Sequence, residues 1–160
     1  MKKRIIIFSV LAVLWCGMIF FLSSENSEES SDRSGEVITT LCEVFVPDYE
    51  NYSETERIQI TTDLSFYVRK AAHFSAYAVL GALLLQVFCF VKDKRLRSAL
   101  AVGGAFVYSA TDEFHQSFVP GRSCEFRDML IDTSGAALAV LISLLIMYLI
   151  TKRKRRKTAQ

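Results

Sequence analysis

The chain has 160 residues, of which 51% are hydrophobic and 22% charged, and its formal net charge is +2. Most of the apolar residues fall in four stretches with few or no charges, each close to the roughly 20 helical residues that cross a bilayer core. A water-soluble protein of this size would need amphipathic helices instead, so the composition excludes that class. It predicts an all-α fold, an integral membrane four-helix bundle forming one domain over residues 1–160, with spans at about 5–22, 71–91, 98–119 and 129–150.

Three clusters of basic residues set the expected orientation of these spans. They lie at residues 1–4, 92–97 and 152–157, each directly beside an apolar stretch. Short loops rich in Lys and Arg stay on the cytoplasmic side of a membrane. Four spans with both termini in the cytoplasm put all three clusters on that side. Residues 23–69 then form a long outer loop, and residues 151–160 form a basic cytoplasmic tail.

This topology separates the charges of the chain. The cytoplasmic side holds thirteen Lys and Arg and one acid, whereas the outer side holds six Lys and Arg and sixteen acids. A basic tail is typical of nucleic-acid binding when it is read alone, but beside a span it more often contacts anionic lipid. We therefore expect a protein of the cell membrane whose partners are membrane lipids, with no nucleic acid.

The first apolar stretch allows two interpretations, a cleaved signal peptide or a permanent anchor. Its apolar run of about 18 residues exceeds the ~7 to 15 of a signal peptide. The residues that follow, Phe20 to Ser24, also lack the small-residue pattern of a cleavage site. An uncleaved anchor is the prediction.

The outer loop is expected to contain two short amphipathic helices. Apolar residues recur at helical spacing after Ser34, a candidate N-cap, and Pro47 would stop that helix. The sequence from Ser53 to Glu56 is a capping box, which predicts a second helix running toward Tyr67. Such helices either lie flat on the outer leaflet or cap the bundle.

The outer loops also contain two cysteines, Cys42 and Cys124, while Cys16 and Cys89 lie inside spans. A disulfide between the outer pair is one interpretation. Two free thiols are the other, and we favour it because nothing in the sequence fixes the distance between them.

Spans two, three and four each carry a polar and small-residue stripe on one helical face. Small residues let helix backbones approach closely, so these faces should pack against one another and bring their polar ends together. The stripes are Lys70, His73, Tyr77 and Gly81; Ala101, Ala105, Tyr108, Asp112 and His115; and Asp128, Asp132, Gly135, Ala139 and Ser143.

The ionisable members of these stripes gather in the outer third of the membrane. An ionised carboxylate facing lipid there costs up to ~3 kcal/mol, so pairing or a wet cavity is expected. We predict a ligand-binding site at this depth, because intramembrane ionisable groups mark functional sites by default. Its candidate residues are His73, Asp112, Glu113, His115, Gln116, Arg122 and Asp128, with Lys70 and Arg127 as second choices.

A purely structural interpretation stands beside this one. Ion pairs such as Lys70 with Asp112, or Arg127 with Asp132, could hold the helix ends together without any ligand. The number of polar groups favours a site, since it exceeds what helix register requires.

Several chemistries fit the candidate residues. Arg122 and Arg127 could grip a phosphate or carboxylate in bidentate fashion. Acid/base catalysis would use His115, with Asp112 or Glu113 as further catalytic candidates. The two histidines with a carboxylate could bind a metal, but no established metal-binding spacing is present, so we predict no metal and no cofactor.

Three motifs, in order along the chain, resemble the VanZ-like family. They are Phe21-Leu22-Ser23-Ser24, the segment from Lys70 to Tyr77, and the string from Asp112 to Arg122 that reads DEFHQSFVPGR, followed by Asp128 and Gly135. Ala76 and Asp132 depart from the residues expected in the family at those positions.

The resemblance implies a small integral membrane protein of the cell envelope, and one family member is associated with resistance to the glycopeptide teicoplanin. The preferred hypothesis is binding of an anionic lipid-linked envelope molecule at the outer leaflet. A membrane-embedded hydrolase or transferase acting on a lipid-linked phosphate is the first alternative, and a non-catalytic scaffold is the second.

Overall fold

The computed structural model describes residues 2–158, and every regular element in that range is helical. The all-α prediction is therefore confirmed. The elements are α1 (Lys2–Ser23), α2 (Ser27–Phe45), the 3₁₀ turn η1 (Tyr49–Asn51), α3 (Glu54–Val87), the 3₁₀ turn η2 (Phe88–Phe90), α4 (Lys94–Gln116) and α5 (Phe126–Thr158).

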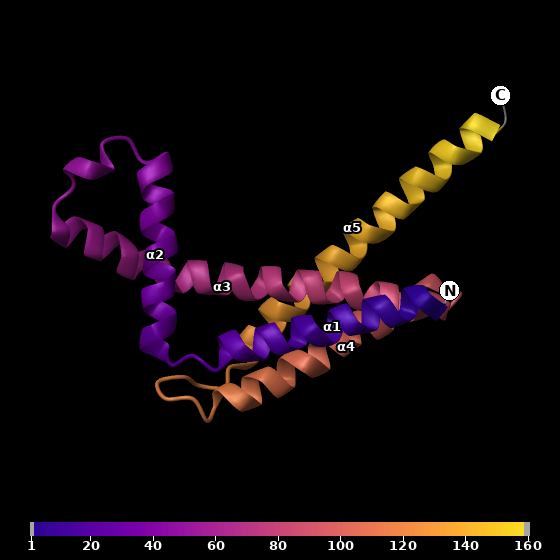
Figure 1. Cartoon of the computed structure of the whole chain (residues 1–160), viewed down its shortest axis with the longest axis horizontal. Coiled ribbons are helices and arrows are strands. Elements are labelled where there is room, and N and C mark those ends of the chain that lie inside the picture. The colour runs from indigo at the N-terminus through magenta and orange to yellow at the C-terminus, as the bar shows by residue number, and fades with distance from the viewer. Residues whose placement is uncertain (1, 159–160) are drawn as a thin grey trace.

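Four of the helices, α1, α3, α4 and α5, pack side by side with alternating direction (Figure 1). Helix α3 is central, because it contacts each of the other three. The start of α1 and the α3–α4 connection lie at the same end of the bundle, where Arg4 donates to the side chain of Gln86. The last part of α5 diverges from the bundle near that end (Figure 1).

Three of these helices are long and apolar enough to cross a membrane, within Lys2–Ser23, Glu54–Phe90 and Phe126–Arg156. Helix α4, which corresponds to the predicted span at 98–119, differs because charged residues lie toward both of its ends. Many large apolar side chains on the outside of the spanning helices are exposed, including Val13, Leu14 and Leu141. Such an apolar exterior suits lipid rather than water.

Helix α2 begins earlier than the sequence predicted. Its N-cap is Asn26, whose side chain accepts hydrogen bonds from the backbone N–H groups of Glu28 and Glu29, while Glu29 reaches back to the Asn26 N–H. Ser34, the predicted N-cap, lies buried within the helix and donates its hydroxyl to the carbonyl of Ser30. The complete capping box at Asn26 places the N-cap eight residues before the predicted one. The predicted stop before Pro47 is confirmed.

Helix α3 joins two elements that were predicted separately. Its capping box at Ser53 and Glu56 is confirmed, but the helix runs on without a break to Val87. No Gly or Pro interrupts residues 54–80, so nothing stops it near Tyr67. Its 34 residues measure about 51 Å, some 20 Å more than a ~30 Å bilayer core, so the first turns extend beyond the membrane.

The small-residue stripes of α3 and α5 pack against each other as predicted. A Cβ atom added at Gly135 would lie 2.1 Å from the backbone oxygen of Phe74, and one added at Gly81 would lie 2.7 Å from Cα of Ala136. These two crossings bring the polar ends of the stripes together.

Helix α2 lies across the end of the bundle that is opposite the N-terminus (Figure 1). It is held to α3 by a small core in which Ile38, Cys42 and Tyr49 are buried and Val68 packs against them. Cys42 is thus buried on α2, whereas Cys124 is exposed in the α4–α5 connection, and both are free thiols. The disulfide interpretation is wrong.

Candidate functional site

A buried carboxylate joins three helices at the end of the bundle nearest α2. Asp112 Oδ2 accepts hydrogen bonds from Ser23 Oγ at 2.9 Å, from Tyr77 OH at 3.3 Å and from Gln116 Nε2 at 3.5 Å. These donors lie on α1, α3 and α4. Tyr77 is fully buried, so its hydroxyl depends on this partner. Asp112 is therefore a hub of the helix packing.

A second buried carboxylate, Asp132 on α5, faces α3 and α4. Its Oδ2 accepts a hydrogen bond from Ser109 Oγ at 2.7 Å, and its Oδ1 lies 3.6 Å from His73 Nδ1. Asp132 is fully buried, while the His73 side chain is about a quarter exposed. The pair thus links the interior of the bundle to the partly exposed end nearest α2.

Glu113 is fully buried and fixes the α4–α5 connection. Its Oε2 accepts a hydrogen bond from the backbone N–H of Glu125 at 2.9 Å. The same connection turns at Gly121, which has a positive φ of 74°. The carbonyl of Pro120 accepts a hydrogen bond from the N–H of Ser27, so the loop is tied to the first residue of α2. This arrangement positions Arg122.

His115 lies apart from both carboxylates. Its ring stacks on Phe20 with centroids 4.3 Å apart, and its Nε2 lies 3.2 Å from Ser24 Oγ. The Ser24 hydroxyl already donates its one proton to the carbonyl of Phe20 at 2.7 Å. Ser24 therefore accepts from His115 rather than being deprotonated by it. In the described part of the chain, Asp112 does not orient His115 by a hydrogen bond.

The ion pairs differ from those considered in the structural interpretation. Lys70 pairs with Asp128, not with Asp112. Arg127 lies over the Phe66 ring at 5.7 Å, and Asp132 faces His73 instead. Both proposed pairs are wrong, because α3 and α5 pack so closely at Gly135 that α5 presents Asp128 to Lys70.

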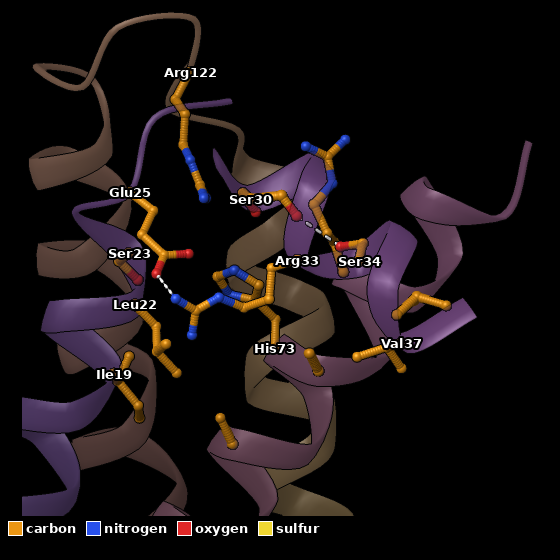
Figure 2. A pocket seen from close by; sticks show the side chains of 14 residues that line it. Ile19, Leu22, Ser23, Glu25, Ser30, Arg33, Ser34, Val37, His73 and Arg122 are labelled. Carbon is orange, nitrogen blue, oxygen red and sulfur yellow. Dashed lines mark hydrogen bonds and ion pairs between the residues drawn. The ribbon is translucent and has the colours of Figure 1, made fainter. Parts of the chain in front are cut away.

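Two hollows open beside this cluster. The first, of about 160 Å³, lies between the end of α1, the side of α2 and α3, and the second, of about 210 Å³, lies under the α4–α5 connection. Arg69, His73 and Arg122 line both. Figure 2 shows the first hollow, with Arg122 entering from the loop above and His73 at its centre. The second is also lined by Lys70, Gln116, Glu125 and Asp128.

The two guanidinium groups shared by the hollows lie outside the ion pairs of the described residues. Among residues 2–158, neither Arg69 nor Arg122 forms an ion pair. Arg69 donates to Ser31 Oγ and Arg122 to Gln116 Oε1, each at 3.5 Å, and Arg122 Nε is buried without a partner. Burial, and then the charge of Arg69, lower the pKa of Arg122. The guanidinium nevertheless keeps its charge, because arginine is not deprotonated in proteins.

The structure thus brings together five of the predicted site residues around the second hollow, namely Lys70, His73, Gln116, Arg122 and Asp128. Asp112 and Glu113 lie buried beneath them, whereas His115 and Arg127 line neither hollow. In the range 2–158, no three His, Cys, Asp or Glu side chains gather in a way that could hold a metal ion.

Sequence reasoning left five residues of the site out of its candidate set: Ser23, Arg69, Tyr77, Ser109 and Asp132. Tyr77 and Asp132 belong to the predicted stripes, so their position on the packed faces was a usable signal. The sequence carried no such signal for Ser109 and Arg69, because each is the chain neighbour of a stripe residue and not a member of the stripe.

The helices and the buried cluster define a class, a helical membrane protein with a polar network closed inside one end of its bundle. The chain belongs to the VanZ/LLP1 family, whose family model matches residues 8–148. The family resemblance is therefore confirmed. No curated protein and no solved structure matches the chain.

Proposed function

We propose that the chain is a multi-pass membrane protein that binds an anionic, phosphate-type group of a cell-envelope molecule in the second hollow. The observation that carries this proposal is that two guanidinium groups, Arg69 and Arg122, line this hollow without forming an ion pair among the described residues. Holding two like charges close together costs free energy unless an anion lies between them. Guanidinium groups bind phosphate oxygens in a bidentate geometry, which suits this role.

Neighbouring acids do not already fill this role. Lys70 is neutralised by Asp128, and Arg33 by Glu25. The Glu125 side chain accepts a hydrogen bond from Ser123, and its backbone N–H is held by Glu113. Arg69 and Arg122 are thus the cations left for a ligand. His73, beside them, can add a further donor.

In this proposal the site faces the outer leaflet and both termini lie in the cytoplasm. The basic runs at residues 2–4 and 92–97 lie at the end of the bundle opposite α2, which matches the orientation that such runs favour. Helix α4 then completes a fourth span. The proposed role is therefore in cell-envelope physiology. It includes reduced susceptibility to glycopeptides such as teicoplanin.

The double substitution Arg69→Gln and Arg122→Gln is expected to weaken binding of pyrophosphate to the purified full-length protein about 100-fold or more. Each charged hydrogen bond contributes about 1.5 kcal/mol, and 1.4 kcal/mol is a factor of ten in affinity. Isothermal titration calorimetry measures the dissociation constant directly.

Arg127→Gln is the matched control, since it removes one charge from the same end of the molecule without touching either hollow. Its affinity should stay within about threefold of the unsubstituted protein at 0.15 M salt, where distant charges are screened. The control removes one charge and the double variant two, so a control that loses half as much binding free energy as the double variant would mean that only the net charge matters, and the site proposal would fail.

A membrane-embedded hydrolase or transferase acting on a lipid-linked phosphate is the second candidate function. The His73–Asp132 contact favours it, because an imidazole backed by a buried carboxylate and lining an anion site is suited to acid/base catalysis. The catalytic histidine of this candidate is His73 rather than His115, whose Nε2 is bonded to Ser24.

Incubation of the reconstituted protein with a lipid phosphate, followed by phosphate release, tests this second candidate. His73→Gln should abolish turnover, and His115→Gln should leave at least half of it, because His115 lines neither hollow. If the unsubstituted protein binds the lipid phosphate but releases no phosphate, the catalytic candidate fails and binding remains as the function.

A further inference from the structure

The first hollow has an apolar lower part beneath its charged rim. We infer that it holds the hydrocarbon chain of an anionic lipid whose phosphate lies at Arg69 and Arg122. This inference rests on the proposed function and identifies the ligand as a lipid rather than a soluble phosphate.

The wall on α3 is a stripe of small and apolar residues. Val68, Ala72 and Ala76 recur every four residues, which places them one above another on a single face of the helix. The two alanines leave room where a larger side chain would close the gap between α1 and α3. The result is a narrow apolar surface that runs along the helix axis, as a hydrocarbon chain does in a bilayer.

The opposite wall comes from the last turns of α1, where Ile19 and Leu22 point toward the hollow (Figure 2). Both walls therefore belong to helices that are long and apolar enough to cross a membrane. A gap between two such helices is bordered by lipid. A chain can enter it sideways from the leaflet without crossing water.

Helix α2 forms the roof. Ser34 and Val37 line the hollow, and Leu41 and Val44 continue the same helical face beyond it. These last two side chains are 47% and 68% exposed, while Asp32, Glu36 and Glu43 occupy the other face. An amphipathic helix that lies across the end of a bundle rests on the leaflet with its apolar face down.

The rim connects this apolar gap to the anion site. Arg69, His73 and Arg122 line both hollows, so a ligand can place its chain in the first and its phosphate in the second without a break. Glu25 and Arg33, which also line the first hollow, form an ion pair beside it (Figure 2). This division into an apolar gap and a cationic end matches the two parts of an anionic lipid.

The experiment uses the full-length protein in phosphatidylcholine nanodiscs with phosphatidic acid that carries a photoreactive diazirine in one acyl chain. After illumination, mass spectrometry of the digested protein locates the crosslinks. We expect them at Ile19, Leu22, Val68, Ala72 and Ala76. Ala72→Trp should reduce crosslinking to these positions at least tenfold, while Ala71→Trp, one position away and outside both hollows, should leave it within twofold.

A second pair of variants, on α2, keeps the test decisive if Ala72→Trp fails to fold. Val37→Trp fills the hollow from the roof and should also reduce crosslinking at least tenfold. Val44→Trp, on the same helical face but beyond the hollow, is its control.

The soluble probe glycerol 3-phosphate separates this inference from the proposed function. If it displaces phosphatidic acid only weakly and the filled variants lose crosslinks, the lipid assignment holds. If it binds as tightly as the lipid and neither tryptophan variant has an effect, the chain site is wrong and the anion site stands. If neither probe binds and crosslinks scatter over the outside of the helices, both fail.

Discussion

Gly135→Leu is expected to abolish the folded protein. The Cβ of any other residue at this position would lie 2.1 Å from the backbone oxygen of Phe74, a distance that no rotamer change can relieve. Helices α3 and α5 would have to separate at this crossing. Overpacking a well-packed interface costs about 1 to 3 kcal/mol even when side chains can move, and here the obstacle is backbone. Size-exclusion chromatography after mild detergent extraction should give aggregate instead of a monodisperse peak.

Gly103→Leu is the control for this substitution. It lies on the exposed side of α4, where an added Cβ would meet nothing within 4 Å. It should elute like the unsubstituted protein, with a thermal midpoint within about 2 °C, because exposed substitutions usually change stability by less than ~0.5 kcal/mol. A monodisperse, thermally stable Gly135→Leu protein would contradict the α3–α5 crossing described above.

Asp112→Leu is expected to lower the free energy of unfolding by about 2 to 4 kcal/mol. The substitution leaves the hydroxyls of Ser23 and Tyr77 and the amide of Gln116 without their shared acceptor. A hydrogen bond between membrane helices contributes about 0.6 kcal/mol on average, and an unsatisfied buried group costs about 1 to 3 kcal/mol. Thermal unfolding in detergent should show a midpoint lower by about 5 to 15 °C.

Asp112→Asn is the informative partner of that variant. An asparagine keeps one carbonyl oxygen in place for the three donors, so it should recover at least half of the lost stability. Thr111→Leu, the neighbouring residue on the exposed side of α4, should be close to neutral. If Asp112→Leu unfolded at the same temperature as the unsubstituted protein, Asp112 would not be the hub of the packing.

The fold could be predicted from the sequence where one physical rule dominated. The length of the apolar stretches predicted the long helices, and the recurrence of small residues at Gly81 and Gly135 predicted which faces pack. The capping box at Ser53 predicted a helix start. Each of these signals is local, since it depends on residues within a few turns of one another.

The errors arose where partners from different helices compete. Lys70 could pair with Asp112 or Asp128, and the choice depends on how far α5 slides along α3, which close contact at Gly135 decides. His115 lies near Asp112 in sequence, yet the rotation of α4 turns it toward Phe20 on α1. Arg69 and its neighbour Lys70 both line the second hollow, but Lys70 pairs with Asp128 on α5 whereas Arg69 donates to Ser31 on α2.

The unbroken helix α3 also determines how the walls of the first hollow are held together. Helix α2 is held to α3 by the small core that contains Ile38 and Cys42, so these two helices form one packed unit. The connection from α1 to α2 is only three residues long, and α1 packs on α3 through Ile19 in the hydrophobic core and through Trp15, which donates to the carbonyl of Ala76. A ligand wider than the first hollow would have to separate α1 or α2 from α3, and it would disrupt one of these two cores.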